Sequence, residues 1–164
     1  MLVRKREPQH GVVFCKKPLD AKKCYIEFKV TINAPIRGKS CLFLGVVDKS
    51  KYKPEQLVST FWKDSPSSYY CDVWSHKLIK IDENGNQAGI AVEYGCECCD
   101  SEEATIGMMY DEKKRTLSYY KNGVNQGIAF HSIPPGLYPS IDLWFETGHV
   151  EIMKRTQPGV KEYL

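Results

Sequence analysis

The feature that most constrains this chain is strict alternation between residues 24 and 32. The even-numbered positions hold Cys, Ile, Phe, Val and Ile, whereas the odd-numbered positions between them hold Tyr, Glu, Lys and Thr. A period of two residues is typical of a β-strand with one buried face and does not fit a helix. Residues 24–32 are therefore predicted to form a half-buried strand.

Further extended segments follow, separated by turn residues. Residues 41–47 are apolar on both faces, which predicts a strand in the middle of a sheet. Residues 105–110 and 116–120 flank a charged turn, and Asn122-Gly123 suits a two-residue type I′ turn before a strand at 125–130. Residues 141–145 and 148–153 are predicted to form the last pair of strands.

Helical signals are few. Pro54–Leu57 fits a single helical turn with proline at its first position, while nine prolines and twelve glycines interrupt the chain. Many short strands with frequent turns favour an all-β fold, a β-sandwich of two antiparallel sheets.

Length and composition limit the classes of protein further. The chain has 164 residues, 42% hydrophobic and 26% charged, as expected of one globular domain and not of a disordered chain, collagen or coiled coil. Its apolar runs are too short for a membrane span, and its charged first residues do not resemble a secretion signal. The net charge of +3 is spread among acidic residues, so we expect no membrane or nucleic-acid partner.

The seven cysteines form an odd set, which favours reduced thiols and a location in the cytosol or nucleus. Cys96-Glu97-Cys98-Cys99 lacks the second ligand pair of a structural zinc site, so no metal is predicted. No nucleophile elbow or glycine-rich phosphate loop occurs, which predicts neither an enzyme nor a cofactor. A metal-binding or enzymatic sandwich that uses Cys96–Cys99 is the alternative from another class.

Two pairs of aromatic residues stand beside segments expected to be loops: Phe61-Trp62 and Trp144-Phe145. A lone tryptophan most often packs in a core. Two ring pairs next to loops, however, favour a protein-binding patch, because large rings bury much apolar area at low entropic cost.

In its ordered motifs the chain resembles a SPRY domain. The motifs that carry the resemblance, in chain order, are Tyr25–Val30, Leu44–Val47, Ile106–Asp111, Thr116–Gly123, Gly127–Phe130, Leu137–Pro139 and Gly148–Ile152. Together they extend over roughly residues 11–153. Two segments depart from the family pattern: Tyr69–Trp74 replaces a tryptophan-rich stretch, and Glu112–Arg115 replaces a turn that often has glycine or asparagine.

The resemblance implies one domain over residues 1–164, with the core at 11–153, folded as a SPRY-like sandwich of the concanavalin-like jelly-roll type. It also implies a non-catalytic, monomeric module that binds a short peptide or protein surface through edge loops. Such a module would be the substrate- or partner-recognition domain of a larger protein such as a ubiquitin ligase. A carbohydrate- or RNA-binding sandwich is a further alternative.

The resemblance also implies a partner-binding site, carried over by motif position from three loops. The residues are Arg37 in the first loop, Tyr52, Phe61, Trp62 and Lys63 in the second, and Trp144, Phe145, Glu146 and Thr147 in the third. Arg37 and Lys63 would form charge-assisted hydrogen bonds with an acidic or amide-rich ligand, and the rings would supply apolar contact.

Overall fold

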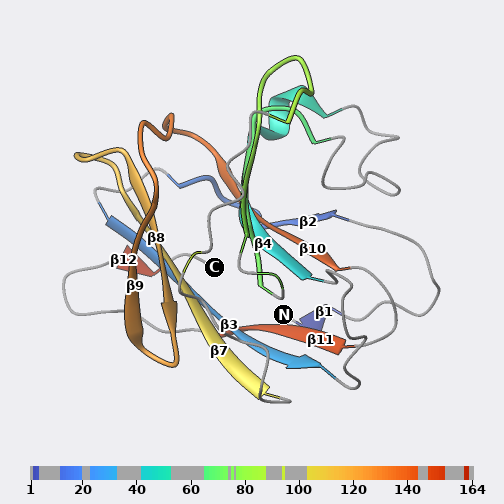
Figure 1. Cartoon of the computed structure of the whole chain (residues 1–164), viewed down its shortest axis with the longest axis vertical. Helices are drawn as coiled ribbons and strands as arrows, with labels where there is room; N and C mark the ends of the chain where they lie inside the picture. Colours follow the sequence, from blue (N-terminus) through green and yellow to red (C-terminus); the bar gives the residue numbers. More distant parts are fainter. Residues whose placement is uncertain are drawn as a thin grey trace.

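The chain folds into two β-sheets that face one another (Figure 1). The computed structural model describes residues 2–3, 12–19, 23–32, 42–52, 65–73, 75, 77–87, 94, 103–143, 148–153 and 161–162. Within these residues the only helical element is one short 3₁₀ turn, η1 (Lys49–Lys51). The predicted all-β sandwich of two antiparallel sheets is confirmed.

The larger sheet has seven strands. Six lie in the order β1, β11, β3, β7, β8, β9, and β12 also pairs with β3. That last pairing is parallel, the one exception to antiparallel pairing among the described strands. The strands are β1 (Leu2–Val3), β3 (Lys23–Ile32), β7 (Glu103–Asp111), β8 (Thr116–Lys121), β9 (Val124–Phe130), β11 (Gly148–Met153) and β12 (Lys161–Glu162).

The smaller sheet has five strands in the order β2, β10, β4, β5, β6. They are β2 (Val12–Phe14), β4 (Leu42–Val47), β5 (Ser68–Asp72), β6 (Lys77–Ile81) and β10 (Tyr138–Leu143). β4 lies in the middle of this sheet, which confirms the prediction drawn from its apolar character on both faces.

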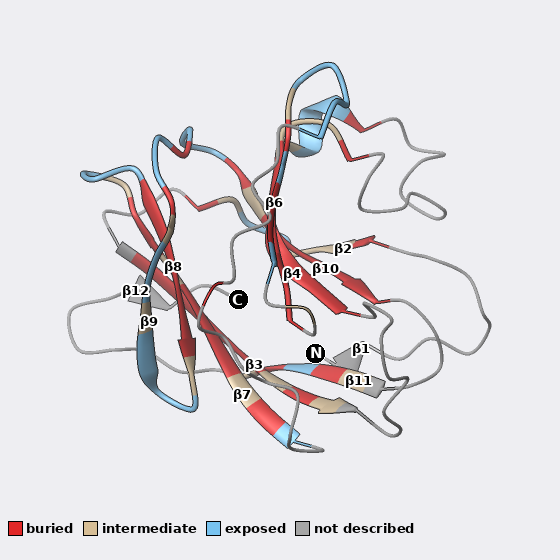
Figure 2. Ribbon diagram, in the orientation of Figure 1, coloured by how far each residue is buried: buried red, intermediate tan, exposed pale blue. Residues whose placement is uncertain are grey.

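The main core lies between the two sheets (Figure 2). The even-numbered residues 24–30 of β3 are at most 2% exposed, so the predicted apolar face is the buried one. Leu42, Leu44 and Val46 of β4 belong to the same core cluster. The hydroxyl of Tyr119 in β8 donates a hydrogen bond to the carbonyl oxygen of Leu44, at 2.8 Å. A polar contact therefore joins the sheets inside the apolar core.

The opposite face of the five-stranded sheet carries a second, smaller cluster. Its buried members are Phe43, Val47, Tyr52, Tyr70, Ile79 and Ile81. Both faces of this sheet are therefore covered, which is why β4 needs apolar residues at consecutive positions.

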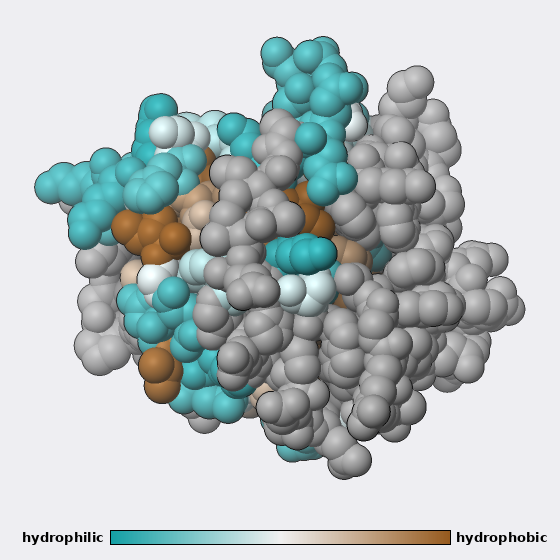
Figure 3. All heavy atoms as spheres, in the orientation of Figure 1, coloured by the Kyte–Doolittle hydropathy of each residue, from teal (hydrophilic) through white to brown (hydrophobic). Residues whose placement is uncertain are grey.

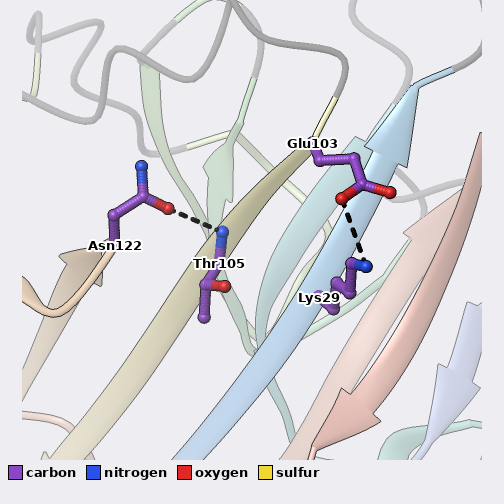
Figure 4. Close-up of polar contacts among 4 residues, drawn as sticks. All are labelled: Lys29, Glu103, Thr105 and Asn122. Atoms are coloured by element: carbon purple, nitrogen blue, oxygen red, sulfur yellow. Dashed lines mark hydrogen bonds and ion pairs between the residues drawn. The ribbon is translucent and has the colours of Figure 1, made fainter.

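The odd-numbered face of β3 is less exposed than its polar sequence suggests. Tyr25 and Glu27 are buried, and the Tyr25 hydroxyl donates to a carboxylate oxygen of Glu27 at 3.2 Å. Further along the strand, the Lys29 ammonium and the Glu103 carboxylate form an ion pair at 3.2 Å (Figure 4). Only the second half of this face thus has the partly exposed character expected from the alternation.

Several element boundaries differ from the predictions. β10 begins at Tyr138, three residues before the predicted start, and the predicted end at 144–145 lies outside the described residues. The predicted helical turn at 54–57 also lies outside them. The sequence pattern predicts no strand at β5 or β6. The sequence of β5 shows no alternation of polar and apolar types, and the structure buries all five of its residues.

Candidate functional site

The predicted partner-binding residues fall mostly beyond the part of the chain that the structure describes. Tyr52 is described. The residues outside are Arg37, Phe61, Trp62, Lys63, Trp144, Phe145, Glu146 and Thr147.

Tyr52 follows η1 and packs on the outer face of the five-stranded sheet. Its N–H donates to the Lys49 carbonyl oxygen at 3.3 Å, which closes the 3₁₀ turn. Its ring lies edge-to-face on Phe14, with centroids 5.0 Å apart, and its side chain is only 9% exposed. The structure thus places Tyr52 in a packed cluster beneath the surface. Its contact with a partner stays a prediction.

The hydroxyl of Tyr52 sits in an environment that keeps it protonated. Burial raises the pKa of Tyr52 to about 12, and the carboxylates of Asp142 and Asp48 act in the same direction, against the opposing effect of the Ser65 and Tyr70 hydroxyls. At neutral pH Tyr52 is therefore uncharged, and its ring packs in the cluster on this face of the sheet.

The strand ends next to the predicted loops give the site its geometry. Ile32 of β3 pairs with Gly148 of β11, and Leu42 of β4 pairs with Leu143 of β10. The segment that contains Arg37 joins Ile32 to Leu42, and the segment Trp144–Thr147 joins Leu143 to Gly148. The two residues that flank the first segment are therefore paired, one to one, with the two residues that flank the third. This arrangement could be found only from strand pairing.

The second predicted loop leaves the sheet at a different place. It follows the other end of β4, where Val47 pairs with Tyr138 at the start of β10. Because β4 is extended over its whole length, the start of the second loop is separated from the Leu42–Leu143 end by the length of that strand, while the Tyr52 ring packs back over the sheet on Phe14. The described residues thus bring the first and third loop attachments together and place the attachment of the second loop at the other end of β4.

The described residues do not test the alternative based on Cys96–Cys99. Cys96–Cys99 lies outside them, and within the described ranges no three His, Cys, Asp or Glu side chains are grouped as metal ligands would be. Cys24 and Cys71 are completely buried in the core, where a cysteine acts as a small apolar residue. In the described part of the chain, no helix has the length and apolar character needed to cross a membrane.

Solved structures with the same architecture include two SPRY domains and a carbohydrate-binding module. The SPRY domain of human HERC1 is 18% identical, with a TM-score of 0.62, and the match covers 91% of this chain and 85% of that one. The PSpry domain of TRIM65 is 16% identical, with a TM-score of 0.57, covering 94% and 86%. The carbohydrate-binding module CBM66 from Bacillus subtilis is 12% identical, with a TM-score of 0.55, covering 93% and 88%. At these identities the likeness shows the fold alone.

The sequence itself decides between these relatives. Among curated proteins none matches it. The family model of the SPRY domain, however, matches residues 23–155, which is most of the chain and includes every strand from β3 to β11. The resemblance seen in the ordered motifs is thereby confirmed, and the chain belongs to the SPRY domain family.

Proposed function

We propose that this chain is a non-catalytic protein-interaction domain that binds a short peptide or a protein surface through its loops. Family membership carries the proposal, because SPRY domains are in general non-catalytic interaction modules. A two-sheet scaffold also suits this role, since loops vary at little cost while the strands keep their packing.

The paired strand ends support a shared contact surface for two of the loops. Arg37 belongs to the segment between Ile32 and Leu42, and Trp144–Thr147 to the segment between Leu143 and Gly148. Tryptophan and arginine are the residue types most enriched among binding hot spots. In the proposal, Trp144 and Phe145 supply apolar contact while Arg37 and Lys63 bind acidic or amide groups of the ligand.

The proposal also covers the oligomeric state of the domain, its compartment and the kind of protein to which it belongs. We infer that it is monomeric, lies in the cytosol or nucleus, and serves as the substrate- or partner-recognition domain of a larger protein such as a ubiquitin ligase. The odd number of cysteines supports a reducing compartment.

Single alanine substitutions of Trp62, Trp144 and Phe145 test the loop site. The probe is a fluorescent peptide selected on the wild-type chain from a random library, and its affinity is measured by fluorescence polarisation. A hot-spot variant should lose ~2 kcal/mol or more of binding free energy, about a 30-fold weaker Kd. Its melting temperature should stay close to that of the wild type.

Ile128→Ala is the matched control. Ile128 is 46% exposed on β9, a strand that adjoins none of the predicted loops, so its truncation removes exposed apolar surface outside the predicted site. The site assignment is wrong if every aromatic variant binds as well as the control, or if each one simply unfolds. Separately, stoichiometric zinc that survives dialysis would favour the alternative based on Cys96–Cys99.

A further inference from the structure

A groove of about 320 Å³ lies at the end of the five-stranded sheet where β4 and β6 end and β10 begins. Its lining includes Asp48, Tyr69, residues 80–83 and residues 134–137, all of which the structure describes. Figure 1 shows the turn after β6 at the top of the view, and Figure 3 shows hydrophilic residues there. We call this feature the acidic groove.

The acidic groove is separate from the first and third predicted loops. It lies at the Val47–Tyr138 end of the paired strands β4 and β10, whereas those loops are attached at the Leu42–Leu143 end. Nothing in the loop motifs of the sequence indicated this surface.

Negative charge predominates in the lining. Asp48, Asp82 and Glu83 contribute three carboxylates, and Lys80 contributes one ammonium group. The groove therefore has a local excess of negative charge on a chain whose net charge is +3. Such a local reversal of sign favours a cationic ligand over an anionic one.

Two of the carboxylates are held in place by hydrogen bonds. Asp48 accepts hydrogen bonds from the N–H and hydroxyl of Ser50, at 3.0 and 2.6 Å. Asp82 accepts from the N–H groups of Asn84 and Asn86, at 2.9 and 2.8 Å. These bonds lower the pKa of Asp82, the backbone bond from Asn86 having the largest effect, so this carboxylate keeps its charge further into the acid range than an ordinary aspartate.

The backbone around the acidic groove is also preformed. The N–H of Asp48 donates to the Ser67 carbonyl oxygen at 3.1 Å, and the N–H of Ser67 donates to the Asp82 carbonyl oxygen at 3.0 Å. These two bonds join the ends of β4, β5 and β6. These backbone groups are already ordered in the folded chain, so a ligand would bind without the entropic cost of ordering them.

The groove already places a cation against an aromatic ring. The Lys80 ammonium lies 5.5 Å from the centroid of the Tyr69 ring, within the range of a cation–π contact. The ring itself packs edge-to-face on Phe130, with centroids 5.5 Å apart. Pro134 and Pro135 add apolar wall with little side-chain freedom to lose.

We propose that the acidic groove binds an arginine side chain of a partner protein, with the guanidinium taking the place of the Lys80 ammonium beside Tyr69. A guanidinium is planar, stacks on aromatic rings and forms paired hydrogen bonds with carboxylates, which the compact lysine ammonium does not. The inference rests on the proposed role in protein recognition but uses a different surface from the paired loops.

The first test is a titration of the ¹⁵N-labelled chain with N-acetyl-arginine methylamide, followed by NMR. The amide resonances of Ser67, Asp82, Glu83 and Gly136 should shift in a saturable manner, because these residues line the acidic groove. N-acetyl-citrulline methylamide has nearly the same shape without the charge, and it should leave these resonances in place.

Charge variants supply the second test. Glu83 is exposed, so Glu83→Lys should keep the fold and weaken binding of the arginine probe by about five-fold or more. Glu151→Lys is the matched control, since Glu151 is an exposed residue of β11 in the other sheet and its charge is screened at physiological salt. Lys80→Ala should strengthen binding, because it removes the competing cation.

The inference is overturned if the arginine probe leaves the groove resonances unshifted, or if citrulline shifts them equally. Equal weakening by Glu83→Lys and Glu151→Lys would also overturn it, because it would mean attraction by net charge alone. Any of these results leaves the proposed function standing, since that proposal is decided by the tryptophan and phenylalanine variants with the selected peptide.

Discussion

Gly45 shows how a single residue serves the packing of the five-stranded sheet. It lies within β4, paired with Tyr70 of β5 on one side and Ser140 of β10 on the other. A Cβ atom at this position would overlap the backbone carbonyl of Tyr69 and the ring of Tyr70. The glycine of the Leu44–Val47 motif is therefore required because nothing larger fits between paired strands.

Gly45→Ala is expected to destabilise the chain by ~2 kcal/mol or more, because paired backbone has to move to admit the methyl group. Urea unfolding measures the change. Gly107→Ala is the comparison: the three atoms nearest to its Cβ all belong to the Tyr25 side chain, which can move more easily than paired backbone, so the loss should be smaller. A Gly45→Ala variant as stable as the wild type would contradict the packing argument.

At the scale of elements, β9 shows how an open sheet edge is protected. It is the outermost strand beside β8, and Val124 and Ile128 on it are 63% and 46% exposed (Figure 2). Its pairing with β8 is irregular, and Gly127 has a φ of +97°. The Gly127 N–H donates to the Asn125 side chain at 2.7 Å, and its carbonyl accepts from the Tyr94 hydroxyl at 2.5 Å. Such an irregular edge is a poor template for another strand.

The turn that leads into β9 can be tested directly. Asn122 and Gly123 both have positive φ, at 48° and 82°, as the predicted type I′ turn requires. The Asn122 side-chain oxygen also accepts from the Thr105 N–H at 2.9 Å (Figure 4). Asn122→Ala loses this bond and strains the backbone, so the free energy of unfolding should fall by about 1–2 kcal/mol.

Asn122→Gly separates the two causes. Glycine adopts the positive φ without strain but lacks the amide, so this variant should lose only the hydrogen bond, about 1 kcal/mol. Thermal unfolding of both variants gives the comparison. If Asn122→Gly is less stable than Asn122→Ala, backbone strain is not what selects asparagine here.

For the whole molecule, buried hydroxyl and thiol groups link stability to alkaline pH. Burial raises the pKa of Tyr52 from 10.0 to about 12 and that of Cys15 from 9.0 to about 11. Burial also raises the pKa of Tyr70 well above its ordinary value. In each case the folded state holds the proton more tightly than the unfolded chain does.

These groups are therefore expected to leave the free energy of unfolding unchanged between neutral pH and about pH 9, and to lower it as the pH rises toward about 12. The unfolded chain ionises first, which lowers its free energy relative to the folded state. Urea unfolding at stepped pH, with tyrosinate absorbance as a second signal, measures this. Tyr70→Phe removes one titrating group, so its stability should depend less on pH. Stability that rises above pH 9 would contradict the assignment.

Local patterns in the sequence were sufficient for much of the scaffold. The alternation at 24–32 identified β3 and its buried face, and the apolar run at 41–47 identified β4 as a central strand. Asn122-Gly123 identified a hairpin. These features could be predicted because strand period and turn chemistry depend on residues close together in the chain.

Tertiary structure alone decided which residues share a surface. Tyr52, predicted as a contact residue, is packed against Phe14, and Tyr25 and Glu27 are buried on the face expected to be polar. The acidic groove joins residues from 48 to 137, and the pairing of Leu42 with Leu143 brings two loop attachments together. Burial and proximity of this kind depend on contacts between distant segments, which no local period or motif in the sequence records.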